Sequence, residues 1–267
     1  MLAKISIPFK LCFRHYNNGG IRGLGGLFIA LLMYALKSQY CNIGTQNRYC
    51  PCCKWKGRQF APYISWSYVV FHSLCPSCYS HARHRGHKVF YDQYKFNSTI
   101  GKLLYFAPEY GIIKYLQNNP NLQIYTSNYG ESRNKMLDEN ISNYNFNLMD
   151  IECKDNMWDI IICHRVLEHI PDDQMGLQEL FRILKPSGIL ILSVPINVNL
   201  DETIIYDEPN PYQNDHYYNY GKDFMSRIPE EFNVTEVKFS DLCPSKDFIE
   251  MSLLEDYIYV CSKPELA

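Results

Sequence analysis

Four cysteines arranged as two close pairs are the clearest chemical signal in the chain. Cys50 and Cys53 form one C-x2-C pair, Cys75 and Cys78 form a second, and 21 residues separate the pairs. Two residues between paired cysteines let both sulfurs turn onto one ion, and two such pairs complete a tetrahedral zinc site. A site of this kind is closed, so its role would be structural. Redox-active pairs, unliganded core cysteines, and replacement of a ligand by Cys52 or a nearby histidine are the alternatives.

A second group of reactive side chains follows a predicted strand within residues 158–195. Trp158–Cys163 is a short, mostly apolar run, as expected for a strand buried on both faces of a parallel sheet. The next segment has apolar side chains at i, i+3, i+4 and i+7, which predicts an amphipathic helix that Pro186–Gly188 ends. Ile189–Val194 predicts a second strand. Because a right-handed crossover places both carboxyl ends at one edge, we expect ligand near Cys163–His169 and Pro195–Asn197.

Two motifs in this unit resemble those of class I S-adenosylmethionine-dependent methyltransferases of the type-11-like group. They are Leu167-Glu168-His169 after the first strand and the sequence LKPSG at residues 184–188 before the second. The resemblance covers roughly residues 99–262. The sequence LYFAPE at residues 104–109, and the residues around both cysteine pairs, resemble a narrower bacterial group with an N-terminal four-cysteine zinc module. An unrelated Rossmann-like unit is the alternative.

The resemblance implies a fold and two bound groups. The expected fold is α/β, with a Rossmann-like class I methyltransferase sheet that is mostly parallel, has its last strand antiparallel, and follows a small zinc-binding module. The implied cofactors are S-adenosylmethionine and a structural zinc ion. The expected divisions are residues 1–40 as a basic and apolar helical segment, 41–91 as the four-cysteine zinc-binding module and 92–267 as the methyltransferase domain.

Several residues are expected to bind the cofactor at the ends of the first strands. Glycines usually let the backbone of the first turn approach the methionine part of the cofactor, but this turn contains only Gly111. LYFAPE matches the narrower group, so binding is still expected, with a non-binding fold as the alternative. After the strand Leu122–Ser127, Asn128 replaces the usual acidic ribose ligand, which weakens binding. The predicted cofactor-binding residues are Ala107, Pro108, Glu109, Gly111, Asn128, Asp150, Ile151 and Cys163.

Asp150 is expected at the end of the third strand, near Asn147–Ile151. The resemblance implies that its carboxylate accepts a hydrogen bond from the adenine exocyclic amine, while Ile151 packs on the adenine ring. A turn- or helix-capping role for Asp150 is the alternative.

The candidate catalytic residues are two histidines and one acidic residue. Methyl transfer needs an aligned acceptor and, for a weak nucleophile, removal of its proton. His164 directly follows the fourth strand, and Asp215 beside His216 would orient and charge-stabilise an imidazole base. His169 is expected to be structural. Residues 214–221 resemble the group's DHVR-YG motif, but have tyrosine where the group has arginine.

The sequence favours a small-molecule or glycan-type acceptor over nucleic acid. The narrower group often accompanies surface-polysaccharide genes, so the resemblance implies a role in surface polysaccharide biosynthesis. A net charge of −2 gives no reason to expect a polyanion, and residues 163–166 lack the Asn/Asp-Pro-Pro-Tyr/Phe motif that nucleobase amino-methylating enzymes use. Asp201–Tyr220 is expected to be a loop that shapes the substrate pocket. A zinc-bearing RNA methyltransferase and a degenerate, non-catalytic methyltransferase-like binding protein are the alternatives.

The N-terminal segment combines basic residues with an uncharged stretch. Gly23–Leu36 carries no charge and follows Lys4, Lys10, Arg14 and Arg22. This plan resembles a signal peptide, but the apolar run is shorter than the roughly 20 residues of a spanning helix. The odd number of cysteines, 11, fits a reducing compartment. We expect a cytoplasmic protein whose residues 21–37 pack on the protein or make peripheral membrane contact, with secretion or a signal anchor as the alternative.

Overall fold

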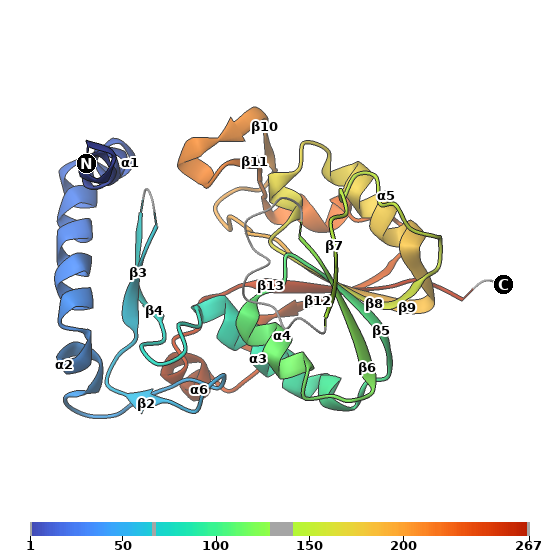
Figure 1. Cartoon of the computed structure of the whole chain (residues 1–267), viewed down its shortest axis with the longest axis horizontal. Coiled ribbons are helices and arrows are strands. Elements are labelled where there is room, and N and C mark those ends of the chain that lie inside the picture. The colour runs from blue at the N-terminus through green and yellow to red at the C-terminus, as the bar shows by residue number, and fades with distance from the viewer. Residues whose placement is uncertain (1, 66–67, 129–140, 266–267) are drawn as a thin grey trace. The chain divides into compact units, whose positions relative to one another are not determined.

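The computed structural model describes residues 2–65, 68–128 and 141–265, and the chain forms two compact units (Figure 1). The first unit comprises Met1–Val89 together with Cys243–Leu254. The second comprises Phe90–Leu242 together with Glu255–Ala267. A short segment near the C-terminus therefore returns to the first unit before the last strand completes the second.

The second unit is built on a 7-stranded sheet with the order β12-β13-β9-β8-β5-β6-β7. Its strands are β5 Gly101–Phe106, β6 Leu122–Ser127, β7 Ser142–Tyr144, β8 Trp158–His164, β9 Leu184–Ser193, β12 Asn233–Lys238 and β13 Tyr257–Ser262. The strands from β5 to β9 pair in parallel, whereas β13 runs antiparallel to both β9 and β12. The predicted fold, a mostly parallel Rossmann-like sheet whose last strand is antiparallel, is confirmed.

Two crossover helices cover opposite faces of this sheet. α4 (Tyr110–Leu116) connects β5 to β6, and α5 (Asp173–Ile183) connects β8 to β9. The two crossovers leave the centre of the sheet in opposite directions, so right-handed connections place the helices on opposite faces. Of the apolar stripe predicted for this helix, Leu177 and Leu180 are buried in the main core, Phe181 is partly buried against it, and Leu184 is buried but already belongs to β9. This arrangement leaves the carboxyl ends of β5, β6 and β8 at one edge.

Helix α5 ends earlier than the sequence predicts. It stops at Ile183, and β9 already begins at Leu184, so Pro186–Gly188 lies inside the strand. The Lys263 side chain explains the early end, because its Nζ donates to the carbonyls of Phe181 and Leu184 at 2.8 Å each. These bonds satisfy carbonyls that a longer helix would otherwise bond internally.

The third strand also lies elsewhere than predicted. It is Ser142–Tyr144, and Asn147–Ile151 forms a turn in which the Asp150 amide donates to the Asn147 carbonyl at 3.0 Å. The Asn147 side chain accepts from the Met149 amide at 3.1 Å. Asparagine side chains that bond nearby backbone in this way compete with a strand ladder and favour turns. Asp150 therefore lies in a loop beyond the strand.

The predicted loop Asp201–Tyr220 contains a β-hairpin. β10 (Ile204–Asn210) pairs antiparallel with β11 (His216–Asn219), and the short helix η4 (Pro211–Gln213) lies in the turn. Asn214 and Asp215 close the turn with φ of 58° and 60°. Asn and Asp tolerate this left-handed conformation better than other residues with a side chain.

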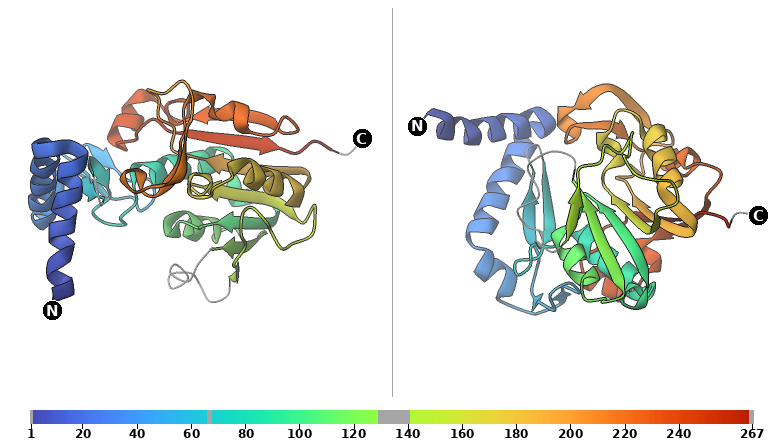
Figure 2. Two further views of the ribbon diagram at one scale, coloured as in Figure 1. Left: turned by 90° about the horizontal axis from the view of Figure 1, so that it is seen from above. Right: turned by 45° about the vertical axis from the view of Figure 1, so that its right-hand side comes forward.

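The first unit combines a long kinked helix with small antiparallel sheets. Its elements are α1 Leu2–Ala35, α2 Lys37–Asn42, β1 Arg48–Tyr49, β2 Lys56–Gly57, β3 Ala61–Ile64, β4 Val69–Leu74 and α6 Ser245–Glu250, and α3 (Ala82–Gln93) begins here. Gly20, with φ 57° and ψ −145°, divides α1 into two arms that meet at an angle (Figure 2). α1 packs on the β3–β4 hairpin. Across the described residues, no helix is both long and apolar enough to cross a membrane.

A buried arginine joins the returning segment to the first unit. The side chain of Arg85 is fully buried, and its guanidinium donates to the carbonyls of Ser73, Ser80, Met251 and Ser252 at 2.7–3.2 Å. A buried charge is tolerated when its hydrogen-bonding groups are satisfied in this way. Two of its four acceptors come from residues 243–254, which explains why this segment belongs to the first unit.

Candidate active site and metal centre

The structure brings together the four cysteines that the sequence predicts as metal ligands. The sulfur atoms of Cys50, Cys53, Cys75 and Cys78 lie within 4.8 Å of one another. The Cys50–Cys78 and Cys53–Cys75 sulfur pairs are each 3.7 Å apart, and all four residues are free thiols. A tetrahedral zinc ion with Zn–S bonds of about 2.3 Å places its sulfurs about 3.8 Å apart. The four residues therefore fit zinc.

The two cysteine pairs share one backbone geometry. In each, the carbonyl of the first cysteine accepts from the amide four residues later, and its own amide donates to the carbonyl five residues later. The four bonds are Lys54–Cys50 at 2.8 Å, Cys50–Trp55 at 2.9 Å, Tyr79–Cys75 at 3.0 Å and Cys75–Ser80 at 2.9 Å. Cys52 lies outside the cluster, and its sulfur faces the His84 carbonyl at 3.7 Å. Two matching knuckles facing one point are the arrangement that a zinc site with four thiolate ligands requires.

The turn after β5 contains a backbone conformation that glycine usually adopts. Ala107 has a φ of 47°, in the left-handed region that glycine favours. Pro108 and Glu109 follow. The Glu109 carbonyl accepts hydrogen bonds from the amides of Ile112 and Ile113 in the first turn of α4, at 3.0 Å each. A Cβ placed on Gly111 would meet no atom within 4 Å. The first turn of α4 is therefore open to a ligand despite the shortage of glycines.

Asn128 lies at the end of β6, beside the β5 turn. Its side chain is buried, and Nδ2 donates to Asn143 Oδ1 at 3.3 Å. The amide can serve a hydroxyl as donor or acceptor, but it offers no charge. Asn128 is the last residue described before residue 141, so the loop that follows β6 lies outside the described residues.

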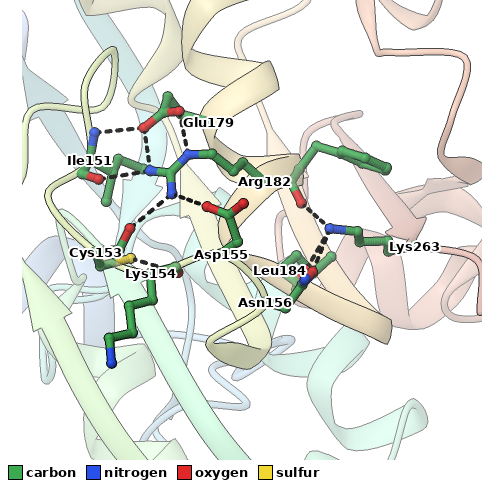
Figure 3. A network of polar contacts seen from close by, with 10 residues as sticks. Ile151, Cys153, Lys154, Asp155, Asn156, Glu179, Arg182, Leu184 and Lys263 are labelled. Carbon is green, nitrogen blue, oxygen red and sulfur yellow. Dashed lines mark hydrogen bonds and ion pairs between the residues drawn. The ribbon is translucent and has the colours of Figure 1, made fainter. Parts of the chain in front are cut away.

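A polar network in α5 holds the loop that carries Asp150 and Ile151 (Figure 3). The Ile151 amide donates to Glu179 Oε2 at 2.7 Å, and Arg182 Nη2 donates to the Ile151 carbonyl at 2.8 Å. Arg182 also binds the Cys153 carbonyl at 2.8 Å. Ile151 is buried and Asp150 is exposed. The helix thus fixes the backbone of this loop and leaves the Asp150 carboxylate exposed.

These residues fit S-adenosylmethionine. Four features lie just after the carboxyl ends of parallel strands or in the loop beside these ends. They are the left-handed turn at Ala107, the open space at Gly111, the amide of Asn128 and the carboxylate of Asp150. In doubly wound sheets, ligands bind at this edge.

Cys163 and His164 end β8 inside the protein. Burial, followed by the charge of Glu168, raises the pKa of the Cys163 thiol. His164 is 1 % exposed, its Nε2 lies 2.7 Å from the Tyr91 hydroxyl and its Nδ1 lies 2.8 Å from Ser193 Oγ. Both ring nitrogens are thus engaged within the second unit. His164 has the surroundings of a structural residue, and it is less suited than His216 to accept a substrate proton.

His216 begins β11 and lies beside the short helix η3 (Leu167–His169). Its ring meets that of His169 edge to face, with centroids 4.7 Å apart. Burial, followed by the charges of His169 and Arg165, lowers the pKa of His216 to about 4. The imidazole is therefore neutral at neutral pH. Asp215 is exposed, and the described contacts include no hydrogen bond between its carboxylate and the His216 ring.

A buried carboxylate fixes the hairpin that carries His216. Asp173 is 1 % exposed, and it accepts from Arg227 Nη2 at 2.7 Å, from Arg227 Nε at 2.8 Å and from the Tyr220 hydroxyl at 3.0 Å. The Tyr218 hydroxyl donates to the Pro171 carbonyl at 2.8 Å. Tyr218 of β11 and Tyr220 directly after it therefore attach the hairpin to the start of α5.

Glu168 and Arg165 lie within the range Cys163–His169 where the sequence predicts ligand, but the sequence did not select either as a catalytic or binding residue. The carboxylate of Glu168 lies within 4.8 Å of ligand nitrogens on His169 and His216. Arg165 forms an ion pair with Asp256 and lies close enough to His216 to affect its pKa. The signal that points to both residues is their place directly after β8, at the edge where ligands bind.

Comparisons with known proteins agree with this geometry. A family model described as a methyltransferase domain matches residues 111–192. No curated protein was found to match the sequence. A similar solved structure is the Burkholderia thailandensis 1,6-didemethyltoxoflavin-N1-methyltransferase with bound 1,6-didemethyltoxoflavin and S-adenosylhomocysteine. It has 12% identity and a TM-score of 0.50, over 69% of this chain and 79% of that one. The PH0226 protein from Pyrococcus horikoshii OT3 is similar at 17% identity and a TM-score of 0.48, over 68% and 90%.

The structural likeness at such low identity concerns the fold, and the family match concerns the segment that runs from the first turn through β9. The chain therefore matches a methyltransferase domain over residues 111–192 and shares the fold of the Burkholderia thailandensis structure.

Proposed function

We propose that the chain transfers the methyl group of S-adenosylmethionine to a small-molecule or glycan-type acceptor at the carboxyl edge of β8. The observation that carries this proposal is the position of β11, which sets the neutral imidazole of His216 beside His169 at that edge. The cofactor supplies an electrophilic methyl group on a sulfonium. The protein must align the acceptor and help it lose a proton.

His216 can assist the acceptor in two ways. A neutral imidazole accepts a proton directly, or it holds a cation that lowers the pKa of the acceptor. Arg165 lies nearby, paired with Asp256, and its guanidinium N–H groups can donate to a polar acceptor such as a sugar or a nucleotide-linked sugar. An acceptor of this type is compatible with a role in surface polysaccharide biosynthesis.

Cofactor binding and transfer are tested separately on the full chain. Calorimetry with S-adenosylmethionine measures binding, and methyl-labelled cofactor with cell extracts, followed by mass spectrometry, identifies the acceptor. We expect His216→Ala to bind the cofactor unchanged and to lose about 100-fold in turnover. Gln213→Ala, at an exposed position of the same hairpin turn, is the control and should keep full activity. Label in RNA would favour an RNA methyltransferase instead, and failure to bind the cofactor would contradict the proposal.

We further propose that Cys50, Cys53, Cys75 and Cys78 bind one structural zinc ion. Support comes from the sulfur spacing of 3.7 Å and from the two matching backbone knuckles. A tetrahedral site filled by four protein thiolates has no position for substrate, so the ion would stabilise the first unit.

We also propose that the second arm of α1 rests on a membrane surface. Ile21, Phe28 and Leu32 are 81 %, 74 % and 56 % exposed and share one helix face, whereas Leu27 and Ala30 are buried. Exposed arginines at positions 14 and 22 precede this apolar face, so the segment combines apolar insertion with attraction to anionic headgroups.

Vesicle co-sedimentation tests this surface contact. The chain should sediment with vesicles that contain anionic lipid, and the double change Phe28→Asp and Leu32→Asp should abolish sedimentation because it places charge in the apolar face. Ile249→Asp changes an exposed apolar residue of α6 and serves as the control. Equal sedimentation of all three proteins would contradict the proposal.

A further inference from the structure

We propose that Glu168, His169 and His216 bind a divalent cation at the acceptor side of the active site, in addition to the cysteine cluster. One carboxylate oxygen and two imidazole nitrogens lie within 4.8 Å of one another. Ligands held at bond lengths of about 2.1 Å lie roughly 3–4 Å apart around a metal. Small side-chain rotations would therefore bring the three atoms into coordination.

Two well-held elements present the three ligands. Glu168 and His169 are adjacent in η3, where the His169 amide donates to the Val166 carbonyl at 2.9 Å. His216 begins β11, which Tyr218 and Tyr220 attach to the start of α5. Ligands on fixed backbone lose little freedom when a metal binds, so the site is preorganised.

The surroundings of the three side chains suit a cation that must also meet a substrate. Glu168 is 1 % exposed, and burial strengthens the attraction between its carboxylate and a cation. His169 is exposed and His216 is half-buried, which leaves an approach from solvent. Arg165 also acts on His216 from outside the cluster, and its ion pair with Asp256 offsets its charge.

The ligand types narrow the choice of metal. Imidazole suits Zn²⁺ and Fe²⁺, and the carboxylate also suits Mn²⁺, whereas Mg²⁺ and Ca²⁺ prefer oxygen ligands. Two histidines and one carboxylate leave coordination positions open, as in catalytic zinc sites and in mononuclear iron sites. An acceptor hydroxyl can take one of these positions.

The chemical role rests on the proposed methyl transfer. An acceptor hydroxyl bound to the cation has a lowered pKa and releases its proton to solvent. The oxygen then forms a bond to the methyl carbon, the carbon–sulfur bond breaks, and its electron pair stays on sulfur as S-adenosylhomocysteine. No oxidant or reductant is consumed. In this role His216 is a metal ligand, and a direct base role for His216 is the competing outcome.

Manganese binding tests the site without substrate or cofactor. Mn²⁺ prefers oxygen and nitrogen ligands over thiolate, so it leaves the cysteine cluster undisturbed. Electron paramagnetic resonance titration of the full chain should show one bound Mn²⁺ per chain. Glu168→Gln and the double variant His169→Ala, His216→Ala should each weaken Mn²⁺ binding at least about 10-fold, with unchanged circular dichroism and an unchanged content of zinc. Gln213→Ala should bind Mn²⁺ like the wild type.

Two results would overturn the inference. One is a wild type that binds no Mn²⁺ and contains one zinc ion per chain, which the cysteine cluster accounts for. The other is equal Mn²⁺ affinity in the wild type and both variants. If the cofactor binds and methyl transfer continues in the presence of excess EDTA, the proposed function stands and His216 acts as a base. If Mn²⁺ binds as expected but S-adenosylmethionine does not, the proposed function fails and the metal site stands.

Discussion

Histidine side chains in the second unit show how strongly surroundings decide the role of a residue. His164 ends β8, and His216 begins β11 beside the short helix that follows β8. The sequence predicts a catalytic role for both. In the structure, Tyr91 and Ser193 engage both nitrogens of His164. His216 lies half-buried beside His169 with a neutral ring. Residue type alone does not separate these cases, because the partners come from distant parts of the chain.

Asp150 provides the most direct test of the cofactor edge at the residue scale. Asp150→Ala removes the proposed acceptor for the adenine amine, so affinity for S-adenosylmethionine should fall about 10-fold, the equivalent of one charge-assisted hydrogen bond. Isothermal titration calorimetry gives the affinity. Glu152→Gln removes a neighbouring exposed charge and should leave the affinity unchanged. Unchanged affinity in Asp150→Ala would remove this residue from the cofactor site.

At the scale of elements, ion pairs at the two ends of α5 hold two loops of the proposed site. Arg182 and Glu179 fix the backbone of the loop that carries Asp150, and Arg227 fixes Asp173 at the start of the helix (Figure 3 shows the first network). The same helix therefore supports both the proposed cofactor loop and the hairpin proposed to face the acceptor. A change in either network should act on the site from a distance.

Arg227→Met tests the support of the hairpin. The substitution leaves the buried Asp173 carboxylate without its guanidinium partner, so unfolding free energy should fall by about 3 kcal/mol. Turnover should also fall because Asp173, which accepts from the Tyr220 hydroxyl next to β11, loses its counter-charge, while cofactor affinity stays the same. Urea unfolding, turnover assays and calorimetry measure these effects. Lys222→Met breaks an exposed ion pair with Asp201 and should leave the unfolding midpoint unchanged. A stable Arg227→Met variant would show that Tyr218 and Tyr220 hold the hairpin without it.

At the scale of the whole molecule, the chain forms two units that are not two consecutive stretches of sequence. Residues 243–254 cross back to the first unit, and Arg85 binds carbonyls of Met251 and Ser252 there. The strands β12 and β13 on either side of this excursion pair with each other in the sheet of the second unit. We expect one unit to be able to unfold while the other stays folded, although the two units share connecting backbone.

Zinc removal tests that separation. A zinc chelator should unfold the part of the first unit around residues 41–90, because binding free energy at a structural zinc site contributes directly to folding. Hydrogen–deuterium exchange should rise across β1–β4 and stay low in β5, β8 and β9. Cys53→Ser should reproduce this pattern without chelator, while Cys12→Ser, at an exposed cysteine outside the cluster, should not. Unchanged exchange after complete loss of zinc would show that the cysteine cluster folds without metal.

The sequence by itself determined the features that depend on local pattern. Apolar runs and helical periodicity predicted the parallel strands β8 and β9 and the helix α5, and the two C-x2-C pairs predicted the cysteine cluster, because these signals come from neighbours in the chain. The rest of the sheet was implied by the family resemblance. Tertiary structure alone decided where α5 ends, since the Lys263 amine that satisfies its last carbonyls lies far along the sequence. It also decided that Glu168, His169 and His216 meet, because the hairpin Ile204–Asn219 brings the third residue to the end of β8. Long-range side-chain contacts of this kind leave no periodic trace in a sequence.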